Sequence, residues 1–415
     1  MLAAFCATSW AASEKVLYRF HGADGNVPGS VIQGPDGALY GTTGEGGANP
    51  CQGQGCGVIF RLTQGTDGKW REAVLHNFTG SDGWFPEGPL VADKAGSLYG
   101  MTVYGGPSCS QLGCGVVFGL VRGNGNKWTF KVLHDFAVTD GANPYAGLIF
   151  DSKGNLYGTT SYGGNTNACT GGCGVVFELS PDGRGSWTGS VLYSFSGDDG
   201  ANPYAPLTFD GSGRLYGTTN AGGVYGSGTV FRLTSSGGGQ WKHEILHSFD
   251  ETDGQQPGYG VTLDGSGNVY GTTPAGGAYH WGVAFMLAST KGGKWKETIL
   301  RNFDEHNFDG GDPSSGLLLD GAGDLYGTVD SGGRYDCRLG GGLGCGVAFR
   351  LTQLKNGKWS ETVLHSFGKS NDGAFPGGDL ARGSAGRQFG TTATGGYTGG
   401  PCVIYGCGVV FEITP

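Results

Sequence analysis

One short unit occurs seven times along this chain, and it constrains the fold more than any other feature. The triplet Tyr-Gly-Thr, or a close variant, begins at Tyr40, Tyr99, Tyr157, Tyr216, Tyr270, Tyr326 and Phe389. A Gly-Gly pair begins six residues after each triplet, and a β-branched segment ending in Phe follows. These phenylalanines, 54 to 64 residues apart, are Phe60, Phe118, Phe177, Phe231, Phe285, Phe349 and Phe411. A period of this length indicates repeated units that bury their apolar faces against one another.

Each unit is predicted to contain four short strands. In the third copy they cover residues 145–150, 155–160, 174–179 and 187–195. Each run is rich in β-branched and aromatic residues and is bounded by Gly, Asp, Asn or Pro, as hairpins require. Four antiparallel strands per repeat are typical of a propeller blade. We therefore predict an all-β fold, a seven-bladed β-propeller with four-stranded blades.

The two ends of the chain predict how the ring closes. The first copy is preceded by a lone outer-type strand at residues 15–20, and the last copy stops after its third strand at 408–413. We expect the N-terminal strand to complete the last blade, because this removes an open sheet edge. The first strand of each copy should then line the central channel, and the fourth should be outermost.

Composition agrees with this fold and excludes some partners. Of 415 residues 88 are glycine, only 15% are charged, and the formal net charge is −9. An acidic chain of this kind is not expected to bind nucleic acid, because phosphate binding needs clustered Lys and Arg. No apolar run has the length of a membrane-spanning helix.

The first residues predict export. Residues 1–13 are small or apolar and uncharged, with a small-x-small pattern before Glu14. They resemble the apolar part and cleavage site of a signal peptide whose basic start is missing. We expect a truncated signal peptide at 1–13, a single propeller at 14–415, and a secreted protein, extracellular or periplasmic.

Ten of the eleven cysteines form five close pairs at one place in the repeat, between the Gly-Gly pair and the third strand. The pairs are Cys51 with Cys56, Cys109 with Cys114, Cys169 with Cys173, Cys337 with Cys345 and Cys402 with Cys407. Zinc would need four converging ligands, whereas these pairs belong to separate blades and have no partnering His. We therefore predict five disulfides, each fixing the shape of one loop.

The motifs YGTT, Gly-Gly, GxVF and VLHxF together resemble the Gloeo-Verruco (GloVer) tandem repeat of secreted bacterial proteins. The resemblance covers residues 15–415 and implies export and a propeller-like fold. It also implies a C-terminal anchoring segment in many members; this sequence ends at Pro415, directly after its last repeat, which leaves anchoring open. The resemblance supplies no catalytic residues.

The repeated polar residues are expected to serve the repeat itself. Each copy begins with Asp-Gly-x-x-Pro, and these aspartates are predicted to cap turns, with an ion-binding ring as the alternative. The histidines of the VLHxF strands are predicted to pack at the outer rim. They are His76, His134, His247 and His365.

Function is better sought where copies depart from the pattern, on the face that carries the Asp-Gly-x-x-Pro and cysteine loops. The ligand-binding candidates are Trp84, Phe85, Tyr279, His280, Trp281, Arg334 and Tyr335. The candidate acids are Glu87, Asp304, Glu305, Asp309 and Asp312. Aromatic rings can stack on sugar rings, and carboxylates can bind their hydroxyl groups. Solvated acidic loops are the alternative interpretation.

Three functions follow from this pattern. The first is a glycan-binding or cell-surface interaction module that uses the loop face, with a polysaccharide or cell-surface glycan as partner. The second is a carbohydrate-active enzyme, a glycoside hydrolase or polysaccharide lyase, which would need a pair of carboxyl groups at the channel mouth. The third is a structural exoprotein. No nucleotide-binding, serine-hydrolase or zinc-protease motif occurs, so we expect no cofactor, although a structural cation remains open. We also expect a monomer.

Overall fold

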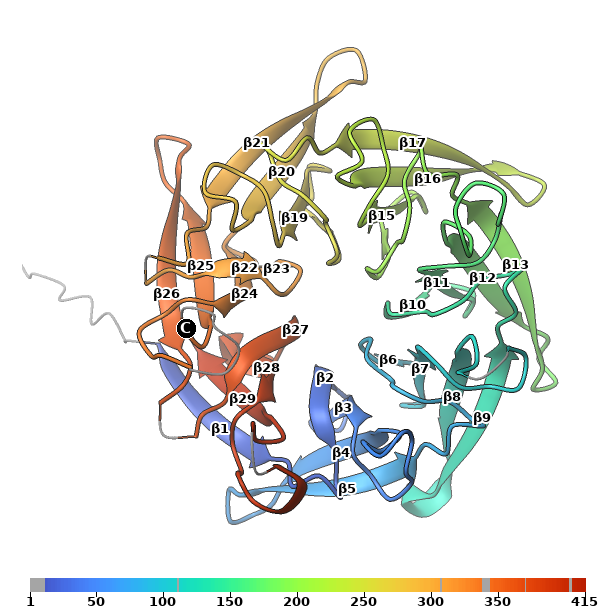
Figure 1. Cartoon of the computed structure of the whole chain (residues 1–415), viewed down its shortest axis with the longest axis vertical. Helices are drawn as coiled ribbons and strands as arrows, with labels where there is room; N and C mark the ends of the chain where they lie inside the picture. The colour runs from blue at the N-terminus through green and yellow to red at the C-terminus, as the bar shows by residue number, and fades with distance from the viewer. Residues whose placement is uncertain (1–11, 110–111, 307, 338–343, 370, 403–404) are drawn as a thin grey trace, which may run out of the picture.

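Seven antiparallel sheets stand around a central channel (Figure 1). The computed structural model describes residues 12–109, 112–306, 308–337, 344–369, 371–402 and 405–415. The predicted seven-bladed, all-β propeller is confirmed, and the described residues contain no α-helix. Three short 3₁₀ turns are η1 (Asn124–Asn126), η2 (Ser384–Gly386) and η3 (Gly400–Cys402). Over the same described residues, no helix is long and apolar enough to span a membrane.

The blades follow one another around the ring in chain order. The first two are β2 (Asn26–Gln33), β3 (Leu39–Glu45), β4 (Val58–Gln64) and β5 (Trp70–Asn77), then β6 (Val91–Ala92), β7 (Leu98–Thr102), β8 (Val116–Arg122) and β9 (Trp128–Asp135). The next two are β10 (Ile149–Phe150), β11 (Leu156–Thr160), β12 (Val175–Pro181) and β13 (Trp187–Ser194), then β14 (Thr208–Phe209), β15 (Leu215–Thr219), β16 (Thr229–Gly237) and β17 (Gln240–Ser248). The fifth is β18 (Thr262–Leu263), β19 (Val269–Thr273), β20 (Val283–Ser289) and β21 (Trp295–Asn302).

The sixth blade has its innermost strand in two pieces, β22 (Gly311–Pro313) and β23 (Leu318–Leu319), which both pair with the next strand. Its other strands are β24 (Leu325–Ser331), β25 (Val347–Gln353) and β26 (Trp359–Ser366). The seventh blade consists of β27 (Ala374–Arg382), β28 (Gln388–Thr394), β29 (Val409–Thr414) and the N-terminal β1 (Ser13–Arg19).

In the second to fifth blades the innermost strand is shorter than the sequence predicted, with two residues each. In the third blade only β10, two residues long, pairs with β11, whereas residues 145–150 were expected. The residues before β10 instead contact the inner segments of neighbouring blades at the axis. A Cβ on Gly88 would lie 2.3 Å from the Ala146 oxygen, and one on Gly147 would lie 2.5 Å from Pro89. These segments therefore pack against neighbouring blades and border the channel.

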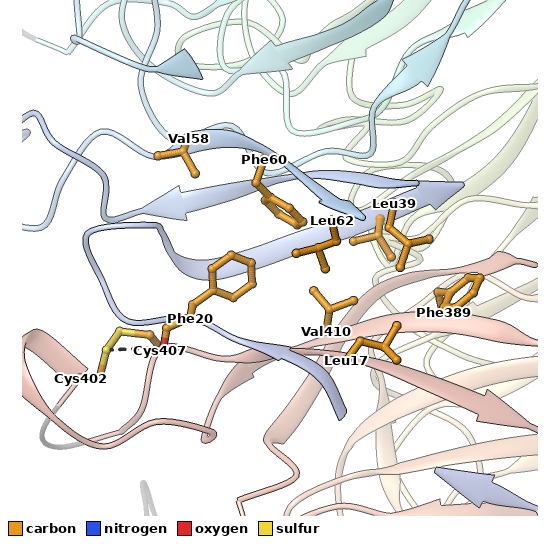
Figure 2. Packing of buried hydrophobic residues seen from close by; sticks show 11 residues of the cluster. Leu17, Phe20, Leu39, Val58, Phe60, Leu62, Phe389, Cys402, Cys407 and Val410 are labelled. Carbon is orange, nitrogen blue, oxygen red and sulfur yellow. Dashed lines mark hydrogen bonds between the residues drawn. A yellow bond between two sulfur atoms is a disulfide. The ribbon is translucent and has the colours of Figure 1, made fainter. Parts of the chain in front are cut away.

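The ring closes as predicted. β1 pairs antiparallel with β29, from Ser13 opposite Thr414 to Arg19 opposite Val409. Just beyond β1, the side chain of Phe20 is fully buried and lies 5.0 Å, ring centre to ring centre, from Phe60 (Figure 2). The first residues of the chain thus join the seventh blade to the first. The predicted signal peptide, residues 1–13, lies outside the described residues except for its last two.

The same Phe–Phe contact joins every pair of neighbouring blades. A buried Phe after each outer strand packs at 4.9 to 5.3 Å on the Phe of the next blade's third strand. The YGTT glycine makes room for this ring, because a Cβ on Gly217 would lie 2.7 Å from the tip of Phe231. The pairs are Phe20–Phe60, Phe78–Phe118, Phe136–Phe177, Phe195–Phe231, Phe249–Phe285, Phe303–Phe349 and Phe367–Phe411.

The Asp-Gly-x-x-Pro aspartates are also parts of these blade junctions. Each aspartate accepts a hydrogen bond from the outer strand that precedes it. The pairs are Tyr18–Asp24, His76–Asp82, His134–Asp140, Tyr193–Asp199, His247–Asp253, Arg301–Asp309 and His365–Asp372. Most of them also accept a backbone N–H from their own turn, for example that of Thr79 for Asp82 at 2.8 Å. The predicted capping and rim roles are confirmed.

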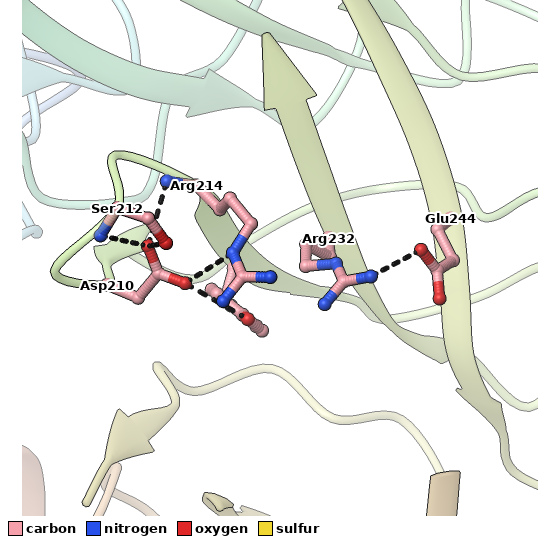
Figure 3. A network of polar contacts seen from close by, with 6 residues as sticks. Asp210, Ser212, Arg214, Arg232 and Glu244 are labelled. Atoms are coloured by element: carbon pink, nitrogen blue, oxygen red, sulfur yellow. Dashed lines mark hydrogen bonds and ion pairs between the residues drawn. The ribbon is translucent and has the colours of Figure 1, made fainter. Parts of the chain in front are cut away.

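The opposite face carries a second repeated device, in the turns between the first and second strands. In six blades the YGTT tyrosine donates a hydrogen bond to an aspartate of the turn. In the fourth blade, Asp210 also accepts the backbone N–H groups of Ser212 and Arg214 and the Arg214 guanidinium (Figure 3). These turns are therefore held in shape by contacts of their own side chains.

All five predicted disulfides are present, each in the loop between the second and third strands of its blade. These loops lie on the same face as the Asp-Gly-x-x-Pro loops. The bonds join Cys51 to Cys56, Cys109 to Cys114, Cys169 to Cys173, Cys337 to Cys345 and Cys402 to Cys407.

The disulfides do more than fix the shape of their loops, which is the role that the sequence predicted. The second cysteine of each bond is at most 5% exposed and packs in the core between two blades. These buried residues are Cys56, Cys114, Cys173, Cys345 and Cys407. The reason is their position, two residues before the third strand begins, where the chain has already entered the core. Each disulfide therefore anchors its loop to the core between blades as well as fixing its shape.

Candidate functional site

A cavity of about 380 Å³ lies at the channel mouth, on the face of the Asp-Gly-x-x-Pro loops. All seven blades contribute to its lining, mainly through the residues that directly follow the loop proline. At the first such position the copies differ, carrying Gly29, Glu87, Tyr145, Tyr204, Gly258, Ser314 and Gly377. The scaffold is thus repeated, but the surface of the cavity is not.

The loops reach this position through a strained residue that is held from the preceding blade. The residue before each loop proline has a left-handed backbone, with φ between 53° and 61°, which is unfavourable for residues other than glycine. The backbone N–H of Phe85 bonds to the Cys56 carbonyl, and that of Asp312 to the Trp281 carbonyl at 2.9 Å. The loops between the second and third strands, with or without a disulfide, therefore position the loops that line the cavity.

Three tyrosines form one side of the cavity. Tyr145 and Tyr204 follow their loop prolines directly, and their ring centres are 5.0 Å apart. Tyr259 comes from the fifth blade. The hydroxyl of Tyr104 lies 3.4 Å from that of Tyr145. These side chains present ring surface and phenol groups together.

Four carboxyl groups lie beside the tyrosines. Glu87 and Asp379 line the cavity itself. Asp312 and Asp330, both from the sixth blade, are close enough to Tyr259 to raise the pKa of its phenol after burial, the main cause. Within the described part of the chain, the side chains of Glu87, Asp312 and Asp330 have no hydrogen-bond partner, whereas Asp379 accepts the backbone N–H of Gly316 at 2.7 Å.

Crowding by protein keeps these carboxyl groups readily protonated. Glu87 is open to the channel but surrounded by the blades, and this desolvation raises its pKa to about 7. Burial, with a smaller contribution from Asp312, raises the pKa of Asp330 to about 7. Burial also raises the pKa of Asp312 and of Asp379. Near neutral pH, Glu87 and Asp330 can therefore both donate and accept hydrogen bonds.

The structure brings only some of the predicted site residues to this cavity. Glu87 and Phe85 line it, and Asp312 lies beside Tyr259. Trp84 is half-buried, packs on Tyr104 with ring centres 5.2 Å apart, and belongs to the core between the first and second blades. It is part of the packing between these blades.

The other candidates lie outside the cavity lining. Trp281 and Glu305 both approach Gly311, next to Asp312, whereas Tyr279 and His280 are exposed. Tyr335 packs against the core between the sixth and seventh blades, and Arg334 is exposed.

Two predicted acids have structural contacts. Asp309 occupies the junction position and forms an ion pair with Arg301. The Asp304 carboxylate accepts the backbone N–H of His306 within its own turn.

Sequence analysis missed Tyr145, Tyr204, Tyr259, Asp330 and Asp379. Their signal was present in the alignment of the copies, at the one to three positions after the loop proline and directly after YGTT. Aromatic residues there read as ordinary strand residues, since nothing local shows that they face the channel.

Two groups of His and carboxylate side chains could approach one cation. They are Glu14, His365 and Asp372, and His247, Asp253 and Glu297, with ligand atoms within 4.8 Å of one another. Both are blade junctions in which the histidine already bonds to the aspartate. We therefore interpret them as structural.

The chain belongs to the Gloeobacter/Verrucomicrobia repeat family, which matches residues 4–208, 110–337 and 209–415. This confirms the resemblance found in its motifs. Among curated proteins, none matches the chain in sequence.

Solved structures share the fold. A fungal alcohol oxidase in complex with copper has a TM-score of 0.58 and 13% identity, over 98% of this chain and 77% of its own. A putative glucose dehydrogenase from Thermus thermophilus has a TM-score of 0.48 and 15% identity, over 97% of this chain and 100% of its own. An α-L-arabinanase from Penicillium chrysogenum, complexed with arabinobiose, has a TM-score of 0.46 and 16% identity, over 77% and 94%. At these identities the likeness concerns the fold alone.

Proposed function

We propose that this protein is an exported glycan-binding propeller whose binding site is the cavity at the channel mouth. The observation that carries the proposal is that a symmetric scaffold builds an asymmetric cavity, with tyrosines on one side and carboxyl groups beside them. Its volume lies near the lower end of the roughly 300–1,000 Å³ typical of ligand pockets. Five disulfides fit a chain that matures in an oxidising compartment.

The chemistry of the cavity suits a saccharide. The faces of Tyr145, Tyr204 and Tyr259 can contact the C–H surface of a sugar ring, while their phenols reach hydroxyl groups. Glu87 and Asp379 add carboxyl oxygens, and Asn220 and Gln256 add amides. A mainly apolar cavity with a few directed polar groups is the usual form of a small-molecule site.

The test is a binding survey with one variant and one matched control. Purified protein is titrated with neutral, basic and acidic oligosaccharides. Tyr204→Ala should lower the affinity for the best ligand by about tenfold or more, because one stacking aromatic side chain supplies much of the binding energy of a small site. Tyr225→Ala is the control, since Tyr225 is an exposed tyrosine of the same blade outside the cavity lining. If no oligosaccharide binds, or if both variants bind like the parent, the proposal is wrong.

A second candidate, a glycoside hydrolase or polysaccharide lyase, is favoured by one observation. Glu87 has a pKa of about 7 through desolvation, which suits a general acid at neutral pH. This function predicts that bound polysaccharide releases new reducing ends, and that Glu87→Gln abolishes the release while retaining binding. If the parent protein binds polysaccharide but releases no reducing ends, the enzymatic function is excluded and only the binding function remains.

A further inference from the structure

The charged groups of the cavity are all of one sign. Glu87 and Asp379 line it, and Asp312 and Asp330 lie next to Tyr259. No Lys, Arg or His belongs to the lining within the described residues. At the blade junctions, by contrast, the loop aspartates are paired, for example Asp309 with Arg301 and Asp372 with His365. The carboxyl groups at the channel mouth thus depart from the pattern of the junctions.

Carboxyl groups that share one site without a counter-charge repel one another when ionised, and a cation that enters the site offsets this repulsion. Glu87 has no hydrogen-bond partner in the described structure, and it influences the phenols of Tyr145, Tyr204 and Tyr259 alike. It therefore lies between the tyrosine side and the acidic side. A ligand that touches both must present an apolar surface next to positive charge.

Resting on the proposed function, we propose that the channel mouth selects glycans with protonated amino groups, such as glucosamine oligomers. The tyrosine faces hold the sugar ring and attract the ammonium group, and Glu87, Asp312, Asp330 and Asp379 supply the counter-charge. Neutral sugars lack this partner. Sugar acids are repelled by it.

Calorimetric titration of the full chain at about pH 7, where Glu87 and Asp330 are about half ionised before the ligand binds, tests the selection. The ligands are a glucosamine oligomer, an N-acetylglucosamine oligomer of equal length, and an oligogalacturonate. The amine form should bind at least about tenfold more tightly than its acetylated form, and the acid should bind least. Glu87→Gln should remove most of the difference between the amine and acetylated forms. Glu251→Gln, the same change at an exposed residue of the loop face, should keep it.

Lowering the pH supplies a second readout. Glu87 and Asp379 line the cavity with the three tyrosines, and Asp312 and Asp330 are close enough to Tyr259 to act on its phenol, with Glu305 close enough to act on Asp312. At about pH 4 Glu87 and Asp330, whose pKa values are raised to about 7, are protonated, so most of the preference for the amine should be lost.

Each outcome distinguishes the two proposals. Equal affinity for amine and acetylated oligomers overturns the selection and leaves glycan binding standing. Binding of none of the three, together with a negative survey, overturns both. Tight binding of calcium or magnesium that displaces the amine oligomer would identify a metal site and also overturn the selection.

Discussion

The blade junctions and the channel mouth use the same seven loops in opposite ways. At the junctions every copy repeats the same arrangement, an aspartate bonded to the preceding outer strand beside a buried Phe–Phe pair. A few residues further along the same loops, at the channel mouth, the copies carry Gly, Glu, Tyr or Ser. The junctions must be equivalent to close a ring, whereas the residues at the axis bear no such constraint. The comparison teaches that the residues repeated in every copy stabilise the ring, and that the residues that differ between copies determine which ligand can bind.

The largest effect should come from a junction phenylalanine. Phe249 is fully buried and packs on Phe285 with ring centres 5.2 Å apart. Phe249→Ala should lower the free energy of unfolding by about 4 kcal/mol, because it removes the ring and leaves a cavity. Tyr204→Ala at the half-buried channel mouth should cost under about 1 kcal/mol. Urea denaturation measures both, and equal losses would contradict the separation of the two regions.

The difference between these regions also decides what could be predicted from the sequence. Blade number, closure and disulfides follow from patterns repeated along the chain, and the short spacing of pairs such as Cys51 and Cys56 leaves little choice of partner. The cavity could not be predicted in the same way. Tyr145 and Asp379 are far apart in sequence and line the same cavity only because the ring closes.

Burial in the loops was equally hidden. Trp84 and Tyr335 looked like free aromatic residues, yet both pack against the core between blades, Trp84 beside Tyr104. Cys173 likewise lies in that core although its spacing from Cys169 indicated only a loop clip. Such packing depends on how one blade sits against the next, which no local pattern records.

A second prediction concerns charge at the junctions. Between the fifth and sixth blades, Arg301 forms an ion pair with Asp309, and its Nε lies 2.8 Å from the nearly buried Glu361 carboxylate. Arg301→Met leaves two acids without a counter-charge and should cost about 3 kcal/mol. Arg301→His introduces the residue that fills this position at four other junctions, and it should recover part of the loss. Equal stability of the Met variant and the parent, by urea denaturation at neutral pH, would contradict a structural role for the pair.

The smallest effect should be a pH-dependent one at the neighbouring junction, where histidine takes the place of Arg301. Glu297 lies 3.6 Å from His247, which already bonds to Asp253 at 2.9 Å, and the second carboxyl oxygen of Glu297 is buried without a hydrogen-bond partner. Burial, reinforced by the negative charge of Asp253, raises the pKa of Glu297 to about 9 from an ordinary value of 4.5.

The direction of the effect follows from this raised pKa. Below about pH 4.5 Glu297 is protonated in both the folded and the unfolded chain, so it does not make stability depend on pH. Between that pH and about 9 the unfolded chain releases the proton while the folded chain retains it, so stability falls as pH rises. Glu297→Gln cannot ionise and avoids this loss. The free energy of unfolding of the variant, relative to that of the parent, should therefore rise by at least about 1 kcal/mol from about pH 5 to pH 8. This is the free energy that corresponds to one unit of pKa shift. Urea denaturation at the two pH values gives the difference directly, and a difference that stays constant with pH would show that the Glu297 carboxyl ionises as freely as an exposed one.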